Sequence, residues 1–319
     1  MPSVLVTRPL PASVESRLRG LFDCTFRTET TPLTPDELRA ALTEYDGVLP
    51  TLGDLFSADV FADVSEPRAK VLANFGVGYN HIDVAAARGA GLQVSNTPGA
   101  VTDATADIGL MLMLMSARRA SEGERLVRAG DWQGWHPVQM LGLHMTGKTM
   151  GIIGMGRIGK AVAKRCALGF DMDVVFHNRS KVSDAGVPGA RQLDSLAEVM
   201  SHADFVVVCV PGGPATKHLI NADAIAAMKP TGHLINIARG DVVDEAALIE
   251  ALQAGRIGGA GLDVYEREPE VPDALRALDN VTIIPHLGTA ALEVRENMGH
   301  MAVDNLEAFF GGKPLPNGV

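Results

Sequence analysis

Hydrophobic residues recur along the first third of the chain in short blocks separated by segments with helical periodicity. Apolar runs cover residues 4–6, 47–49, 71–75 and 92–94, and residues 35–42 have the spacing of a helix that buries one face. Strand-like runs that alternate with helical segments are typical of βα units. The first third is therefore predicted to form a parallel α/β layer.

The second half of the chain repeats this alternation more regularly. Six runs rich in Val and Ile predict the strands 150–153, 174–177, 205–210, 233–238, 259–264 and 281–285. Strands that are apolar throughout are buried on both faces, as in a parallel sheet covered by helices. Six is the number of strands in a doubly wound dinucleotide-binding domain. We therefore predict an α/β protein of two Rossmann-like lobes, the second built on such a sheet.

Two longer helices are predicted beside these strands. Residues 102–119 are polar at first and then apolar on nearly every face from Leu110 to Met115, which is typical of a buried helix, here wedged between two lobes. We expect its methionines to pack in a core rather than to hold a cofactor. A last helix, 291–310, follows the final strand and is expected to cross back to the first lobe.

Length, composition and charge narrow the functional class. The chain has 319 residues, 46% of them hydrophobic, which suffices for two cores. Its net charge of −10 provides no basic surface for nucleic acid or anionic membranes. The longest apolar stretch, 108–115, is too short to cross a bilayer, and the first residues do not resemble a secretory signal. We therefore expect a soluble, cytoplasmic protein with a small-molecule ligand and no nucleic-acid or membrane partner.

The cysteines indicate neither a disulfide framework nor a metal centre. Cys24, Cys166 and Cys209 are far apart in sequence and belong to no CxxC or Cys/His cluster. We expect free thiols in a reducing compartment, and no metal.

A glycine-rich turn follows the first of the six strands. Gly154, Gly156 and Gly159 form a G-x-G-x-x-G pattern. Gly154 would permit the tight turn, Gly156 would let backbone amides approach a pyrophosphate, and Gly159 would let helix and strand pack closely. The following helix adds the unpaired amides of its N-terminus. A plain tight turn is the alternative, but the strand before and the helix after favour a dinucleotide site.

The end of the next strand bears on which dinucleotide binds. NAD-binding versions of this fold have an acidic residue about 20 residues beyond the glycine turn, which accepts a hydrogen bond from the adenine ribose. Here the segment reads VVFHNRSK, with Asn178 in that place, followed by Arg179, Ser180 and Lys181. An amide tolerates a 2′-phosphate and Arg179 can pair with it. We therefore expect NADPH to be preferred, with NAD as the alternative if Arg179 and Lys181 merely belong to a solvated turn.

Three chemically able residues stand at the carboxyl ends of successive strands. Arg239 follows 233–238, Glu268 lies in the loop after 259–264, and His286 follows the strand that ends at Pro285. Ligands of open parallel sheets bind at this edge. Taken singly, each residue could instead be structural: an ion-paired arginine, a loop carboxylate or a core histidine.

Together the three side chains form a coherent set for reducing a 2-oxo acid. The planar fork of Arg239 matches a carboxylate. A protonated His286 can act as general acid toward the carbonyl oxygen, which gains negative charge as hydride arrives. Glu268, bonded to the far ring nitrogen, would orient the imidazole and favour its charged form. We therefore predict that Arg239, Glu268 and His286 are catalytic.

With the glycine turn, INIARGD, Glu268 before a proline, and PHLGTA, the chain resembles the D-isomer-specific 2-hydroxyacid dehydrogenases over essentially its whole length, and among them the glyoxylate/hydroxypyruvate reductases. The resemblance implies a discontinuous, flavodoxin-like substrate-binding domain, 1–98 plus 288–319, around an inserted dinucleotide-binding domain, 99–287. It implies reduction of a small 2-oxo acid to the D-2-hydroxy acid with NAD(P)H.

The resemblance also implies a homodimer built around the cofactor lobe. The long loop that carries Trp132 and Trp135 would reach the partner subunit. Ordinary core or rim packing of both tryptophans is the alternative.

Further site residues follow from the same resemblance. In the segment NFGVGYNHID, the amides of Val77 and Gly78 would bind the substrate carboxylate, and the glycines permit that close approach. Leu52 is expected beside the substrate, together with Arg239 and His286. The cofactor is expected to contact Gly154, Met155, Gly156, Arg157, Ile158, Gly159, His177, Asn178, Arg179, Ser180, Val210, Pro211, Thr216, Ile237, Ala238, Arg239, Asp263, His286 and Gly288.

Two other functions stay open at this point. Some proteins of this fold are dinucleotide-sensing corepressors, and others act on different 2-hydroxy acids, as 2-ketogluconate reductase does. Formate dehydrogenases have glutamine where Glu268 stands, which argues against formate. The physiological 2-oxo acid depends on the shape of the pocket around Leu52, Phe75 and Met140, which the sequence does not give.

Overall fold

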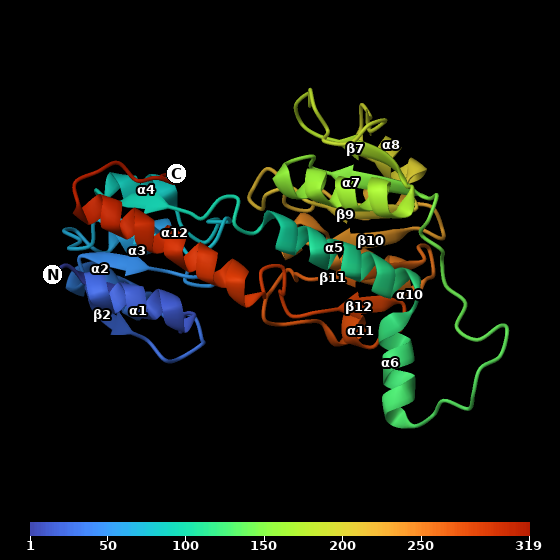
Figure 1. The fold of residues 1–319 in the computed structure, drawn as a ribbon, viewed down its shortest axis with the longest axis horizontal. Coiled ribbons are helices and arrows are strands. Elements are labelled where there is room, and N and C mark those ends of the chain that lie inside the picture. The colour runs from blue at the N-terminus through green and yellow to red at the C-terminus, as the bar shows by residue number, and fades with distance from the viewer. The chain divides into compact units, whose positions relative to one another are not determined.

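The computed structural model describes residues 1 to 319 and divides them into two compact α/β units (Figure 1). Unit 1 comprises Met1–Val101 and Ala290–Val319, and unit 2 comprises Thr102–Thr289. The domain boundaries predicted from the sequence lie after residues 98 and 287. The boundaries between the compact units lie after residues 101 and 289. Each unit is built on one sheet in which all paired strands are parallel, which confirms the predicted fold class.

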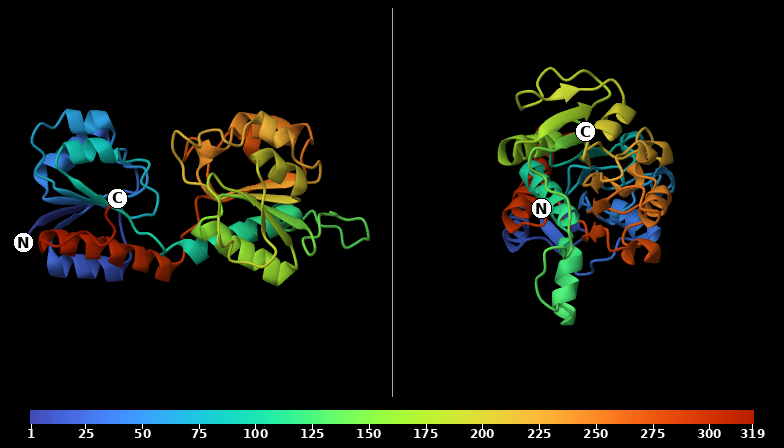
Figure 2. Two further views of the ribbon diagram at one scale, coloured as in Figure 1. Left: turned by 90° about the horizontal axis from the view of Figure 1, so that it is seen from above. Right: turned by 90° about the vertical axis from the view of Figure 1, so that its right-hand side faces the viewer.

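Unit 1 has a five-stranded sheet with helices on both faces. Its strands, in the spatial order β2-β1-β3-β4-β5, are β1 (Ser3–Val6), β2 (Asp23–Phe26), β3 (Gly47–Leu49), β4 (Val71–Ala73) and β5 (Gln93–Ser95). This is the strand order of flavodoxin. Its helices are α1 (Ala12–Leu21), α2 (Pro35–Glu44), α3 (Ala58–Ala62), α4 (Val84–Gly89) and α12 (Leu292–Phe310). In Figure 2, α1 and α12 cover one face and the other three helices cover the opposite face.

Local sequence explains two of these helices. At the start of α2, Thr34 and Glu37 form a reciprocal capping box, and Pro35 occupies the first turn, where its missing N–H costs nothing. In α12, Gly299 lies against Val14 of α1: a Cβ at this glycine would come within 2.5 Å of a Val14 methyl group. The last helix can therefore pack tightly on the first.

Unit 2 has a seven-stranded sheet in the order β12-β11-β10-β9-β6-β7-β8. Its strands are β6 (Thr149–Ile153), β7 (Asp173–His177), β8 (Arg191–Gln192), β9 (Phe205–Val208), β10 (His233–Asn236), β11 (Gly259–Leu262) and β12 (Val281–Ile283). Four of them end two residues before the predicted bounds. The residues cut off, such as Ile237, Ala238 and Asp263, leave the ladder and begin the loops at the carboxyl edge of the sheet.

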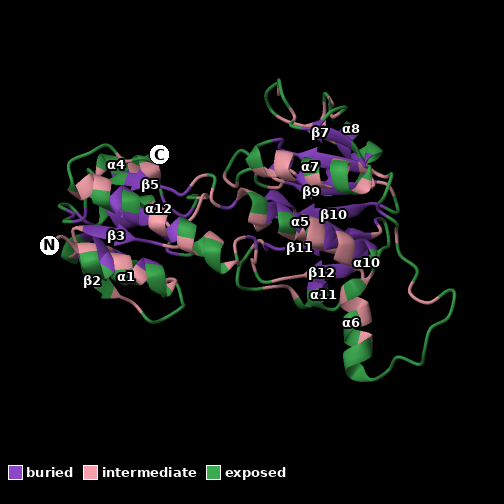
Figure 3. Cartoon of the chain, in the orientation of Figure 1, coloured by how far each residue is buried: buried purple, intermediate pink, exposed green.

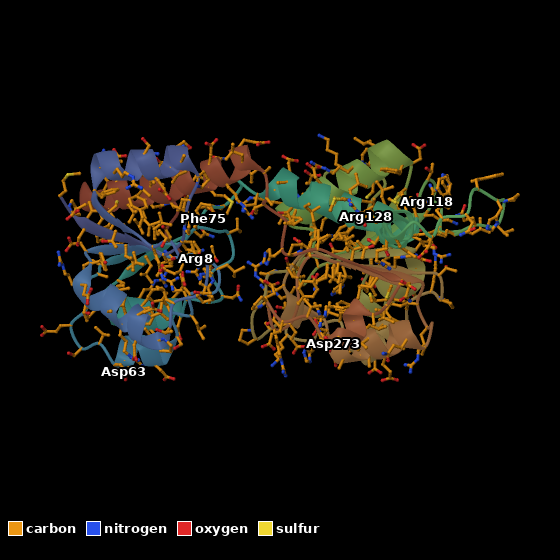
Figure 4. All side chains as sticks on the ribbon, turned by 90° about the horizontal axis from the view of Figure 1, so that it is seen from below. Arg8, Asp63, Phe75, Arg118, Arg128 and Asp273 are labelled. Carbon is orange, nitrogen blue, oxygen red and sulfur yellow. The ribbon has the colours of Figure 1, made fainter.

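The helices of unit 2 again lie on both faces of its sheet. They are α5 (Thr102–Ala117), α6 (Ala120–Ala129), α7 (Arg157–Phe170), α8 (Leu196–His202), α9 (Ala222–Ala226), α10 (Glu245–Gln253) and α11 (Asp273–Arg276), with a 3-10 turn η1 (Gly240–Val242). One hydrophobic core packs α5 and α7 against one face of the sheet. A second core packs the helices α8, α9, α10 and α11 against the other face. Side chains fill the space on both sides of each sheet (Figure 4). No helix of the protein is long and apolar enough to span a membrane.

Within unit 2 alone, α5 buries only part of its apolar surface. Gly109, Leu112 and Met113 are buried against α7 and the sheet, whereas Leu110 and Met111 are only partly buried (Figure 3). The helix therefore leaves a half-exposed apolar face in unit 2.

A buried histidine joins this helix to the sheet. His233, at the start of β10, stacks on Phe205 with ring centroids 5.5 Å apart, and its Nδ1 lies 2.7 Å from Ser116 Oγ. Burial lowers the pKa of His233 to about 4, from 6.5. Because the folded pKa lies below the unfolded one, the unfolded chain binds the proton more tightly between pH 6.5 and pH 4.

We expect His233 alone to lower the free energy of unfolding by up to about 3 kcal/mol as the pH falls from 7 to 4. The stability is complete above pH 6.5 and is lost as the pH falls toward the folded pKa. His233→Gln keeps a polar partner for Ser116 but does not titrate, so it should lose this part of the pH dependence. Urea unfolding midpoints measured at several pH values test this. The same dependence of the midpoint on pH in the wild type and in His233→Gln would contradict it.

Candidate active site

The loop between β6 and α7 has the geometry of a phosphate-binding turn. Gly154 has a φ of +97°, and a Cβ there would lie 2.8 Å from a Val210 methyl group. A Cβ at Gly159 would lie 2.3 Å from the Gly154 carbonyl oxygen, whereas one at Gly156, which precedes α7, would meet nothing within 4 Å. Two glycines are thus required by packing, and the third leaves open space at the helix N-terminus. The turn fits the pyrophosphate of a dinucleotide.

The loop after β7 is held by two side-chain amides. Asn178 Nδ2 donates to the carbonyl oxygen and the hydroxyl of Ser180, at 3.1 and 3.3 Å. Gln192 of β8 donates to the carbonyl oxygens of Asn178 and Ser180 and accepts from the Val182 N–H at 2.9 Å. Arg179 stays exposed between them. The sequence did not indicate Gln192, because its partners lie 10 to 14 residues away.

Other predicted cofactor residues lie in the remaining loops of this edge. Thr216 Oγ1 donates to the Pro211 carbonyl oxygen at 2.7 Å, which closes the loop after β9. Ile237 and Ala238 are buried directly after β10. The loops that carry the predicted residues thus all follow strands of one sheet at its carboxyl edge.

Glu268 and His286 lie in direct contact in unit 2. Glu268 Oε2 is 2.8 Å from His286 Nδ1, and Oε1 accepts from the Tyr265 N–H at 3.1 Å. Burial by itself raises the pKa of Glu268, but the hydrogen bonds from His286 and Tyr265 and the charge of Arg239 outweigh it, so that the pKa is lowered overall. The carboxylate is therefore ionised at neutral pH.

A cavity of about 310 Å³ adjoins this pair. It is lined by Tyr265, Glu268, Pro269, Val271, Ile283, Ile284, Pro285 and His286. Because most of these walls are apolar, they lower the local dielectric and strengthen the hydrogen bond between the carboxylate and the imidazole.

Asp263 shapes the backbone that presents His286. His286 has a φ of +51°, in the left-handed region, and its N–H donates to the Asp263 carbonyl oxygen at 3.0 Å. The buried carboxylate of Asp263 accepts from the N–H groups of Leu287 and Gly288. Burial raises the pKa of Asp263, and these N–H bonds oppose the shift. From the sequence we expect Asp263 only as a cofactor contact; its bonds to the turn of His286 are not indicated there.

Arg239 is fixed at the end of β10. Its Nη1 donates to the Ala238 carbonyl oxygen at 2.7 Å, and Asn236 Nδ2 donates to the carbonyl oxygen of Arg239 at 2.9 Å. Burial lowers the pKa of Arg239, and the charges of Glu268 and Asp241 oppose that shift. The three residues predicted to be catalytic are thus one electrostatically coupled group in unit 2.

The predicted substrate residues of unit 1 lie in two loops at the carboxyl edge of its own sheet. Leu52, which is exposed, follows β3 in a loop held by the fully buried Asp54. That carboxylate accepts from Arg8 Nη1 at 2.9 Å and from Thr7 Oγ1 at 2.6 Å. Val77 and Gly78 lie in the loop that follows β4. In Figure 4, the labels of Arg8 and Phe75 mark this unit. No group of three or more His, Cys, Asp or Glu side chains is placed to hold a metal ion, and the three cysteines are free thiols.

Comparison with known proteins gives matches over the whole chain. A family model described as the NAD-binding domain of D-isomer-specific 2-hydroxyacid dehydrogenases matches residues 110–288. The glyoxylate reductase of Pyrococcus furiosus is 40% identical over 99% of this chain and 94% of its own length. The glycerate dehydrogenase of Hyphomicrobium methylovorum is 37% identical over 98% of this chain and 97% of its own.

Among solved structures, an NADPH-dependent glyoxylate/hydroxypyruvate reductase of Sinorhizobium meliloti, in complex with NADP and malonate, is 34% identical to this chain. The match has a TM-score of 0.88 and covers 100% of this chain and 96% of that one. The similarity therefore extends to both units.

Proposed function

The chain belongs to the D-isomer-specific 2-hydroxyacid dehydrogenase family, and on this basis we propose that it reduces a small 2-oxo acid, glyoxylate or hydroxypyruvate, to the D-2-hydroxy acid. The observation that carries the proposal is the 2.8 Å contact between Glu268 and His286, near the partly buried Arg239 and on the same sheet edge as a dinucleotide turn. Relatives named glyoxylate reductase and glycerate dehydrogenase support this substrate class. Their names give no support to a corepressor.

The residues of unit 2 divide the reaction between them. A bound reduced nicotinamide supplies the hydride. Glu268 accepts the Nδ1 hydrogen of His286, so that Nε2 carries the proton given to the carbonyl oxygen as that atom gains negative charge. The ionised Glu268 stabilises the imidazolium before transfer. Arg239 binds the substrate carboxylate through its planar fork, and the amides of Val77 and Gly78 form a second carboxylate-binding group.

We further propose that NADPH is preferred over NADH. No acidic side chain stands at the end of β7, where the amide of Asn178 is bonded within its own loop. The exposed Arg179 forms no ion pair within the chain, so its guanidinium is available for a 2′-phosphate. The relative from S. meliloti is described as NADPH-dependent.

We propose that a second copy of this chain covers an apolar surface of unit 2. Helix α6 has no buried residue, and it projects from the unit together with the loop that leads to β6 (Figure 1). This loop exposes Trp132 and Trp135, at 52% and 78% of their surface, along with Val138 and Leu141. Exposed apolar patches of this kind mark association sites.

We assign the protein to the cytoplasm, where its three free thiols would stay reduced.

The proposed reaction makes His286 and Glu268 separable. His286→Gln should lower kcat by about two to four orders of magnitude, because the positioned acid is lost, while the Kd of the reduced cofactor changes little. Glu268→Gln should change the pH profile of activity, because His286 loses the carboxylate that accepts its Nδ1 hydrogen. Spectrophotometric assays over a panel of 2-oxo acids measure both. A kcat of His286→Gln above a tenth of the wild-type value would contradict the assignment of His286 as the general acid.

The cofactor preference should depend on one guanidinium. We expect kcat/KM to be about tenfold to a hundredfold higher with NADPH than with NADH, since a hydrogen bond to a charged group contributes about 1.5 to 3 kcal/mol. Arg179→Ala should abolish the ratio while leaving kcat with saturating NADPH nearly intact. Lys181→Ala removes an exposed cation from the same loop and serves as the matched control. Equal efficiencies of the wild type with both cofactors would refute the preference.

Light scattering tests the proposed dimer. The wild type should have about twice the 33.7 kDa mass of one chain. Replacing Trp132 and Trp135 together by serine should shift the mass toward the monomer, because the apolar loop loses its two largest side chains. Leu168→Ser, which removes an exposed leucine from α7, should leave the mass unchanged. A monomeric wild type at micromolar concentration would rule the dimer out.

A further inference from the structure

The loop that follows β4 has three successive carbonyl groups, each bound by a side-chain amide. Asn74 Nδ2 donates to the carbonyl oxygens of Gly76 and Gly78, both at 3.0 Å. Asn96 Nδ2 donates to the carbonyl oxygen of Val77 at 2.8 Å. Both asparagines are buried, Asn74 completely. The loop is therefore held by two asparagines from the ends of neighbouring strands.

The orientation of the Asn74 amide is itself fixed. Both of its N–H bonds go to loop carbonyl groups, so the acceptor facing His81 Nε2, at 3.0 Å, is Asn74 Oδ1. That contact requires a hydrogen on His81 Nε2, and His81 is buried as well. The amide cannot turn over without placing its oxygen against the carbonyl oxygens of Gly76 and Gly78.

Fixing these carbonyl groups also fixes the amides that follow them. A trans peptide unit is planar, so its N–H points opposite to its C=O. The bonds to the carbonyl groups of residues 76, 77 and 78 therefore set the directions of the N–H groups of Val77, Gly78 and Tyr79. None of these three N–H groups donates to an acceptor within unit 1. Backbone donors left over in a partly buried loop are available to an anionic ligand.

We propose that Asn74 and Asn96 are positioning residues for the substrate carboxylate, because they hold the peptide units whose N–H groups bind it. This inference rests on the proposed function, and it adds Tyr79 N–H to the donors at Val77 and Gly78. Neither asparagine touches the substrate. Donors held in place before binding lose less conformational freedom when the ligand arrives, so the effect is on affinity.

Asn74→Asp is the most direct test because it changes shape least. The carboxylate has no N–H to donate and repels the carbonyl oxygens of Gly76 and Gly78. We expect the KM for glyoxylate or hydroxypyruvate to rise about tenfold to a hundredfold, as loss of one or two hydrogen bonds implies. The inhibition constant of oxalate, a carboxylate ligand that is not reduced, should rise in parallel. The Kd of NADPH, from fluorescence titration, should stay within twofold.

Asn96→Asp is a second, independent test, because Asn96 binds a different carbonyl group, that of Val77. It can be used even if Asn74→Asp folds poorly. Asn305→Asp is the matched control. Asn305 is another fully buried asparagine of unit 1, whose Nδ2 donates to the Met301 carbonyl oxygen and whose Oδ1 accepts from the Asn317 N–H. It makes no hydrogen bond to the loop after β4. Its variant should leave both the KM and the oxalate constant within twofold of the wild type.

The outcomes separate this inference from the function on which it rests. A wild type that reduces no 2-oxo acid would overturn the proposed function. An active wild type, with KM and oxalate inhibition unchanged in both folded loop variants, would overturn only the positioning role. The positioning role would also be overturned if Asn305→Asp raised the KM as much as Asn74→Asp, because the effect would then reflect a general loosening of unit 1.

Discussion

The parallel pairing of β10, β11 and β12 is the constraint on which the chemistry of unit 2 depends. In a parallel sheet all strands end at the same edge, so residues about 20 to 30 positions apart in sequence are brought together by the ladder. The register places Asn236 beside Leu262, and Leu262 beside Ile283. Arg239, Glu268 and His286 follow these strands within a few residues. No direct sequence proximity is needed, because the ladder brings the ends of the strands together.

The loops that leave this edge create a second problem, because their backbone groups lose the sheet partners but stay partly buried. An unpaired buried N–H or C=O costs as much as a lost hydrogen bond. In this chain buried polar side chains supply the missing partners: Asp263 for the turn of His286, Asn236 for Arg239, and Asn74 for the loop after β4. The same bonds that satisfy the backbone also fix the direction of the functional groups. Stability and orientation are thus provided by the same residues.

Sequence periodicity was sufficient for the long-range plan of the fold and insufficient at its margins. Six strands of unit 2 were predicted because they are continuous runs of apolar residues, most of them rich in Val and Ile, although β11 reads GAGL. The edge strands β2 and β8 were missed: β2 alternates between exposed and partly buried residues, and β8 has only two residues. The glycine turn, Arg239, Glu268 and His286 could be found because their chemistry is local and distinctive. Asn74, Gln192 and the second role of Asp263 could not, because each acts through backbone atoms, which leave no trace in residue type.

The electrostatics of the coupled group show how its members stay charged in a partly buried site. Burial disfavours the charged forms of both Arg239 and Glu268, and it is the largest influence on each. For Glu268 the hydrogen bonds from His286 and Tyr265 reverse that influence, so the pKa falls below its ordinary value. For Arg239 the nearby acids only oppose it, yet a guanidinium has so high a reference pKa that it stays charged at neutral pH. The chain therefore keeps a cation and an anion adjacent in a partly dry site. Glu268 thus acts on both neighbours: its Oε2 lies 2.8 Å from His286 Nδ1, and its charge opposes the lowering of the Arg239 pKa.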